Sequence, residues 1–150
     1  MLSFMKPKKE EYTIIVGCGR LGANIANELS ERGGNVLVID CNKDAFRKLS
    51  SSFSGITLVG NATHINVLHE AEIERATTVI SVTNKDNANI LVAQIAKEQF
   101  GISHVIARLY NPEYECVYRE FNIDTICPAV LSAKEIDKLL NIYETEDEEL

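Results

Sequence analysis

Short apolar segments rich in β-branched residues alternate with longer amphipathic segments along nearly the whole chain, and this alternation restricts the possible folds more than any other feature. Each apolar segment is uniformly hydrophobic, as in parallel strands that are covered on both faces. Six such segments predict strands: Tyr12–Val16, Asn35–Ile39, Ile56–Val59, Thr77–Val82, His104–Ala107 and Thr125–Ile126. Because βαβ crossovers are right-handed, we expect one parallel sheet with helices on both faces. The prediction is an α/β fold with a doubly wound sheet of about six strands.

The segments between the predicted strands have helical character. Leu21, Ile25 and Leu29 recur at four-residue spacing, and Gly33–Gly34 is expected to end that helix. Asn42 is placed to cap the next helix. The remaining predicted helices are Lys43–Ser51, Thr63–Glu70, Asp86–Phe100 and Glu113–Phe121, the last with Pro112 in its first turn.

The end of the chain predicts one more helix, Ala129–Tyr143. It carries an apolar stripe made of Val130, Ala133, Ile136, Leu140 and Tyr143, with Leu139 beside it. Two interpretations stay open, because the stripe suits packing either on the protein's own sheet or on a partner subunit. We expect an N-terminal tail over 1–11, the main domain over 12–128, this helix over 129–143 and a solvated acidic tail over 144–150.

Composition excludes several classes of function. A net charge of −7 argues against a nucleic-acid partner, which needs a basic surface. No apolar run approaches the ~18 residues of a membrane span, and the start lacks the features of a signal peptide, so we expect a cytoplasmic protein without direct membrane insertion. No metal-ligand or catalytic spacing links the cysteines and histidines, which are Cys18, Cys41, Cys116, Cys127, His64, His69 and His104.

The glycine-rich loop Gly17–Gly22 leaves the first predicted strand, opens the first predicted helix and matches the pattern G-x-G-x-x-G. Gly17 permits a tight turn, Gly19 has no side chain to keep phosphate away, and Gly22 lets the helix approach the strand closely. A phosphate at this loop would meet free amide groups and the positive end of the helix dipole. The loop in this context predicts a Rossmann-type nucleotide site.

Asp40 ends the second predicted strand, 18 residues after Gly22. A carboxylate at this place accepts hydrogen bonds from the ribose hydroxyls of an adenosine. Its negative charge would repel a 2′-phosphate, so NADP is disfavoured. NAD(H), AMP, ADP and ATP all remain open as ligands.

Further candidates follow the other strands, because ligands of such sheets lie beyond the carboxyl ends of the strands. Gly60–Thr63 follows the third predicted strand and Thr83–Asn84 the fourth, and both suit either ligand binding or ordinary turn chemistry. Arg20 in the loop and Arg108 at the end of the fifth strand are the cations expected near phosphate, although an exposed arginine is often only solvated.

Four stretches in this order carry a resemblance to a known family: Gly17–Gly22, Gly60–Thr63, Val79–Asn84 with Asn87 and Asn89, and Val105–Pro112. From Tyr12 to about Leu140 the chain resembles the RCK amino-terminal (TrkA-N) nucleotide-binding domain of the Trk/Ktr-type potassium-uptake regulators. The resemblance implies a regulatory subunit rather than an enzyme. It also implies an adenine nucleotide as signal, dimers or larger homo-oligomers, and a membrane potassium transporter or channel as partner.

The resemblance assigns roles to residues of the candidate site. It places the glycine loop at the phosphates, Asp40 at the ribose, and Arg108 as a further phosphate ligand. The full set of candidates is Gly17, Cys18, Gly19, Arg20, Leu21, Gly22, Asp40, Cys41, Asn61, Ala62, Thr83, Asn84 and Arg108. Of these, Asn61 and Ala62 are expected near the base, and the helix over 129–143 is expected to cross to a partner subunit.

Two departures from the family pattern leave alternatives open. Asn61 stands where the family's Gly-Asp-Ala-Thr turn has an acid, which removes one negative charge from the pocket. The family's second ligand-sensing domain has no room in this chain, so either a separate chain supplies it or there is none. The competing functions are a small NAD-dependent oxidoreductase and a nucleotide-binding redox or stress sensor that uses Cys18 and Cys41.

Overall fold

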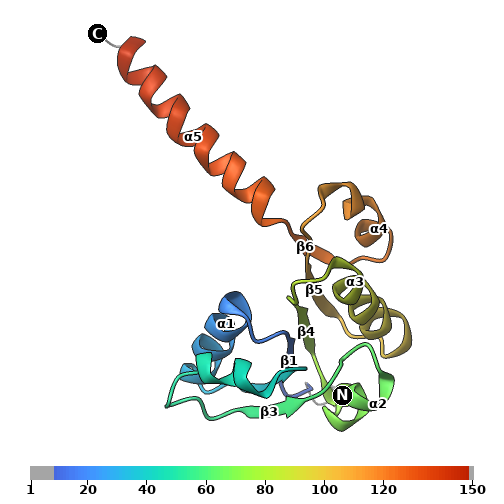
Figure 1. Ribbon diagram of the computed structural model, residues 1–150. Coiled ribbons are helices and arrows are strands. Elements are labelled where there is room, and N and C mark those ends of the chain that lie inside the picture. Colours follow the sequence, from blue (N-terminus) through green and yellow to red (C-terminus); the bar gives the residue numbers. More distant parts are fainter. Residues whose placement is uncertain (1–8, 149–150) are drawn as a thin grey trace, which may run out of the picture.

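Six parallel strands form a single sheet in the computed structural model, which describes residues 9–148 and, for side chains, residues 9–141 (Figure 1). The strands are β1 (Tyr12–Val16), β2 (Asn35–Asp40), β3 (Ile56–Val59), β4 (Thr78–Ser81), β5 (His104–Arg108) and β6 (Asp124–Ile126). The predicted doubly wound α/β fold is confirmed, with the ends of four strands shifted by one residue.

The order of the strands is β3-β2-β1-β4-β5-β6. From β1 the chain adds β2 and then β3 on one side of the sheet. It then crosses to the other side of β1, where β4 pairs with β1 and is followed by β5 and β6. At this switch point the loops that follow β1 and β4 diverge to opposite faces of the sheet. A crevice is expected beyond the carboxyl ends of these two strands.

Alternate residues of the strands enter two separate hydrophobic clusters, which explains why each strand is apolar throughout. Ile14 and Val79 face the cluster that α2 (Ile65–Glu70), α3 (Asp86–Gln94) and α4 (Glu115–Glu120) cover. Ile15 and Ile80 face the opposite cluster, which α1 (Arg20–Glu31) and the 3₁₀ segment η1 (Lys43–Lys48) cover. The strands β1, β2 and β4 are thus buried between two helical layers, whereas the edge strand β3 leaves Ile56 and Val59 63% and 52% exposed.

The first predicted helix ends as expected. The amide of Gly33 donates to Ser30 O at 3.0 Å, and the amide of Gly34 donates to Leu29 O at 2.9 Å. This pair of bonds is the Schellman arrangement, in which a glycine after the helix lets the chain turn back over the last carbonyl groups.

The predicted α-helix over Lys43–Ser51 is wrong, because this segment is the shorter 3₁₀ helix η1. Asn42 caps it as expected, accepting the amide of Asp44 at 3.0 Å. Beyond Lys48 the backbone becomes extended, and the amide of Ser50 donates to the Asn27 side chain of α1 at 2.9 Å. This contact between distant parts of the sequence replaces the hydrogen bonds that a longer helix would make.

Three other helices differ from the prediction at their boundaries. The helix α2 begins at Ile65 rather than at the predicted Thr63, because the Thr63 amide and hydroxyl both bond to the Asn61 side chain. The helix predicted to reach Phe100 continues after α3 as a π-helical turn, η3 (Ile95–Gln99). The next one opens with a 3₁₀ turn, η4 (Pro112–Tyr114), before α4 begins, and a further 3₁₀ turn, η2 (Ile73–Arg75), follows α2.

The last helix, α5 (Pro128–Glu148), projects away from the sheet (Figure 1). Its side chains Leu131, Ile136, Leu139 and Leu140 are 54%, 58%, 51% and 57% exposed. Ile136, Leu139 and Leu140 therefore do not pack on the protein's own sheet, whereas Val130 at the start of the helix is half-buried. The side chain of Tyr143 lies outside them, and the backbone of the expected acidic tail is helical as far as Glu148.

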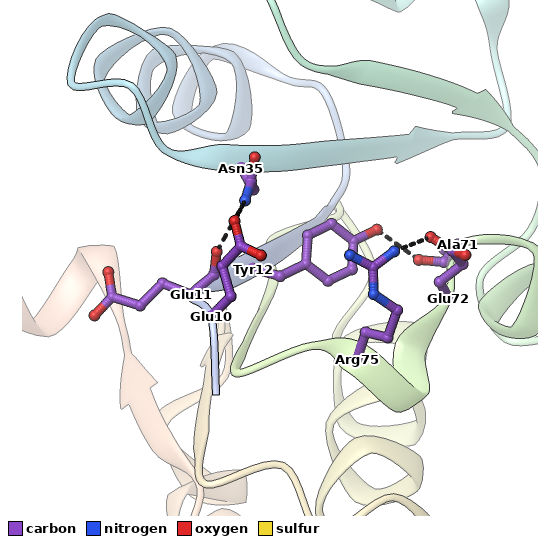
Figure 2. Close-up of polar contacts among 7 residues, drawn as sticks. All are labelled: Glu10, Glu11, Tyr12, Asn35, Ala71, Glu72 and Arg75. Carbon is purple, nitrogen blue, oxygen red and sulfur yellow. Dashed lines mark hydrogen bonds and ion pairs between the residues drawn. The ribbon is translucent and has the colours of Figure 1, made fainter. Parts of the chain in front are cut away.

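Polar contacts link residues at the amino ends of the strands, around a small cavity of about 160 Å³ (Figure 2). The Tyr12 hydroxyl donates to Ala71 O at 2.5 Å, and the Arg75 guanidinium lies 5.7 Å from the centre of the Tyr12 ring. Arg75 also pairs with Glu72 at 2.7 Å, and the Asn35 side chain donates to Glu10 at 3.0 Å. Of the predicted N-terminal tail, residues 1–8 lie outside the described part. Within residues 9–148, no helix is long and apolar enough to cross a membrane.

Candidate nucleotide-binding site

A cavity of about 700 Å³ opens at the carboxyl ends of β1, β2 and β4, where the order of the strands predicts a crevice. Its volume is in the range of sites for small molecules and cofactors. It brings together ten of the thirteen candidate residues: Gly17, Cys18, Gly19, Asp40, Cys41, Asn61, Ala62, Thr83, Asn84 and Arg108.

The other three candidates do not line the cavity. Arg20 is exposed at the start of α1, and Leu21 packs against the hydrophobic cluster on the α1 face of the sheet. Gly22 is buried behind the loop, where an added Cβ would lie 1.9 Å from Gly17 O. Gly22 thus allows the close approach between helix and strand that the motif predicts.

The glycine loop leaves an open approach to the first turn of α1. Gly17 has a φ of +104° and lies against the end of β4, where an added Cβ would come within 2.9 Å of Val82 O. A Cβ on Gly19, in contrast, would meet nothing within 4 Å. The first backbone bond of the helix runs from the Ala23 amide to Gly19 O, so the amides before Ala23 are not used by the helix. This geometry fits a phosphate group at Gly19.

Asp40 holds the glycine loop against the end of β2. One carboxylate oxygen accepts the amide of Cys18 and the other accepts the amide of Asn42, both at 2.8 Å. Each oxygen of a carboxylate has room for a second hydrogen bond. The half-buried Asp40 can therefore fix the loop and still accept ribose hydroxyls from the cavity.

Cys18 is fully buried in the loop, whereas Cys41 is exposed. Burial raises the pKa of the Cys18 thiol and the neighbouring Asp40 raises it further, while Lys48 lowers it. Because the thiolate is the reactive form of cysteine, this environment disfavours Cys18 as a redox centre.

Asn89, on α3, fixes the opposite wall of the cavity. Its side-chain oxygen accepts the Thr83 amide at 2.9 Å and the Thr83 hydroxyl at 2.7 Å. Its side-chain nitrogen donates to Thr83 O and to Arg108 O, each at 3.0 Å. Asn89 is fully buried and joins the ends of β4 and β5. From the sequence, Asn89 was singled out only as one of the residues that carry the family resemblance. Its role in positioning the ends of β4 and β5 was not predicted.

Arg108 also belongs to this wall. Its Nη2 donates to Val82 O at 2.9 Å and to Thr83 O at 3.0 Å. The guanidinium lies 5.0 Å from the centre of the Tyr110 ring, and its Nε is buried without a partner among the described residues. Much of the hydrogen-bonding capacity of Arg108 is therefore used within the protein, although the side chain still lines the cavity.

The cavity is also lined by two lysines that were not predicted from the sequence, Lys48 and Lys85. Lys85 directly follows Thr83 and Asn84, so its distance from the end of the strand could have revealed it. Lys48 reaches the cavity from η1, whose 3₁₀ geometry was not predicted. The other missed lining residues include Asn42, Asn87 and Leu91.

Comparison with known proteins identifies the family. The sequence model of the TrkA-N domain matches residues 13–128. The chain belongs to the TrkA-N domain family. The Trk system potassium uptake protein TrkA of Streptomyces coelicolor is 40% identical over 115 residues, which are 77% of this chain and 52% of that protein. The TrkA homolog of Methanothermobacter thermautotrophicus is 32% identical over 130 residues, 86% of this chain and 60% of that protein. The chain thus spans about half the length of these relatives.

Solved structures of TrkA-N and RCK domains share the fold. The RCK domain of GsuK superposes with a TM-score of 0.76 at 24% identity, over 95% of this chain and 30% of that chain. GsuK bound to ADP gives a TM-score of 0.65 at 16% identity, over 82% of this chain and 32% of that chain. The AMP-bound Kef C-terminal domain of Shewanella denitrificans gives 0.73 at 17% identity, over 88% of this chain and 82% of that chain.

Proposed function

We propose that the chain is a cytoplasmic regulatory subunit of a membrane potassium transporter or channel and binds an adenine nucleotide as a signal. The observation that carries this proposal is the cavity at the switch point, which combines the open approach at Gly19 with the carboxylate of Asp40. Family membership supports the link to potassium uptake, because the curated relatives are Trk potassium uptake proteins. AMP and ADP are bound by proteins of the same fold, which supports an adenine nucleotide here.

The ligand is AMP, ADP, ATP or NAD(H), and NADP is disfavoured. Asp40 places negative charge where a 2′-phosphate of the adenosine would lie. The site binds its nucleotide and does not transform it. Both oxygens of Asp40 already hold backbone amides, so this carboxylate is engaged in positioning the loop.

Substitution of Gly19 by valine tests the site. A side chain at Gly19 enters open space and its φ of −79° suits any residue, so the fold is expected to stay intact. The valine would fill the approach to the α1 amides, and we expect nucleotide affinity to fall by more than about tenfold, since each 1.4 kcal/mol lost is a factor of ten. Calorimetric titration with AMP, ADP and NAD measures this. Valine at Asn24, exposed on α1 and outside the cavity, is a control for an added valine in this region.

The regulatory role is tested by capture of a potassium transporter from the native membrane with and without the bound nucleotide. A ligand can drive regulation only through a difference in its affinity for two states, so the captured amount must depend on the nucleotide. Mass spectrometry of the denatured protein identifies the nucleotide that copurifies. Normal potassium uptake in a strain lacking the chain would contradict the proposal.

The partner of α5 is a second copy of the chain. The stripe residues Ile136, Leu139 and Leu140 are each more than half exposed in the single chain, an arrangement typical of helices that pack between subunits. Aspartate at Ile136 and Leu139 is expected to shift a dimer toward monomer in sedimentation experiments. Aspartate at Lys138, exposed on the opposite side of α5, is the control, and an unchanged dimer in the double variant would place the interface elsewhere.

A further inference from the structure

The cavity carries a charge opposite to that of the whole chain. One carboxylate lines it, Asp40, against three cationic side chains, Lys48, Lys85 and Arg108. The chain as a whole has a net charge of −7. Asn61, also in the lining, is neutral. This local excess of positive charge in an acidic protein indicates an anionic ligand.

The arginines singled out in the sequence do not supply free charge at the centre of the cavity. Arg20 is exposed and lies outside the lining. Arg108 uses Nη2 for two carbonyl groups of the β4 end, and its guanidinium lies over Tyr110. Its position is therefore set by the protein itself.

The two lysines differ from the arginines in this respect. Lys48 and Lys85 are exposed, and within the described residues neither ammonium group makes a hydrogen bond or an ion pair. Lys48 comes from η1, which follows β2, and Lys85 directly precedes α3, which follows β4. The wall of the cavity at Asp40 and the wall at Asn89 thus each contribute one unpaired cation.

The electrostatic influence of Lys48 reaches the glycine loop. Its charge opposes the effect of burial and of Asp40 on the Cys18 thiol, lowering a pKa that those two raise. Cys18 lies between Gly17 and Gly19, where the geometry fits a phosphate. Lys48 is therefore close enough to act on an anion bound at the loop.

We infer that Lys48 and Lys85 bind the phosphate groups of the ligand from opposite walls and make affinity depend on phosphate charge. This inference rests on the proposed nucleotide site and names its specificity-determining residues. Ammonium groups on flexible stems recognise phosphate as point charges and need no fixed geometry. Phosphorylated adenine ligands would then be separated from adenosine by these two residues rather than by the arginines.

Calorimetry on the full chain with adenosine, AMP, ADP and NAD tests the inference. The variants are Lys48→Gln and Lys85→Gln, alone and together, because glutamine keeps most of the aliphatic stem and removes the charge. Each is expected to weaken ADP binding about fivefold, in line with a partly exposed ion pair, and to leave adenosine affinity unchanged. Lys85→Arg keeps the charge and should restore ADP binding. Lys43→Gln, on η1 but outside the lining, is the matched control.

The outcomes separate this inference from the proposed function. An ADP-to-adenosine affinity ratio that falls in the double variant and a weaker dependence of ADP binding on salt support the inference. If the ratio stays constant while Gly19→Val still abolishes binding, the lysines are only solvated and the inference fails alone. If the unaltered chain binds neither these four ligands nor ATP, the proposed function fails and the inference with it. Circular dichroism and the thermal midpoint verify that each variant is folded.

Discussion

The two ends of the sheet use polar residues in opposite ways. At the amino end, Arg75 pairs with Glu72 and the Tyr12 hydroxyl donates to Ala71 O, so the groups satisfy one another (Figure 2). At the carboxyl end, Asp40 and Asn89 bond mainly to backbone groups of neighbouring loops. The first arrangement leaves only a small cavity of about 160 Å³, whereas the second holds its loops apart around a cavity of about 700 Å³.

This difference shows how a regular fold creates its larger cavity at one end. Parallel strands end in loops that alternate between the two faces, and at the switch point these loops diverge. A hollow at that place persists only if the loops are fixed by something other than mutual packing. Asp40 does this for the loop after β1, and Asn89 does it for the loop after β4.

The largest effect is expected from Asn89→Ala at the carboxyl end. The substitution leaves the Thr83 amide and two carbonyl groups without their partner in a buried setting, so we expect the free energy of unfolding to fall by about 3 kcal/mol. Urea denaturation measures it. Asn24→Ala, on the exposed side of α1, is the control and should change stability by less than about 0.5 kcal/mol. Similar values for both would mean that the second wall does not depend on Asn89.

The fold was predictable from the sequence because burial on both faces leaves an uninterrupted signal. Ile14 and Ile15 enter different clusters, so neither position of β1 tolerates a polar residue. The failure at Lys43–Ser51 has the opposite origin. There the helix ends because Ser50 bonds to Asn27, a contact between residues 23 apart that no local pattern reveals.

The site was predictable where local sequence determines it. The glycine loop and Asp40 lie at fixed places relative to β1 and β2, and the structure brings them to one cavity. The direction of Arg20 and the bonds of Arg108 to β4 depend on tertiary contacts, so a residue type alone could not place them. The ligand roles of these residues remain predictions.

A smaller effect, on binding rather than on folding, is expected from Asp40→Ala. The variant loses the acceptor for ribose hydroxyls, and hydrogen bonds to a charged group are worth about 1.5–3 kcal/mol, so nucleotide affinity should fall at least about tenfold. The amides of Cys18 and Asn42 also lose their acceptor, which costs stability of about 1 kcal/mol. Calorimetry with ADP and with 2′,3′-dideoxy-ADP separates the two effects. An equal loss for both ligands would show that Asp40 acts only through the loop.

The smallest effect is expected at the amino end, from Tyr12→Phe. The variant loses the hydrogen bond to Ala71 O, so stability should fall by about 1 kcal/mol while nucleotide affinity stays the same. Burial raises the pKa of Tyr12 above the ordinary tyrosine value of 10.0, Glu72 raises it further and Arg75 lowers it. A raised pKa means that the unfolded chain loses the proton first, so the stability that the hydroxyl provides is complete below pH 10 and declines as the pH rises above it. The difference in unfolding free energy between the two proteins should therefore shrink above pH 10. Equal stability of the two proteins below pH 10 would show that Tyr12 contributes through its ring, which the variant keeps beneath Arg75, and that the hydrogen bond to Ala71 O matters little.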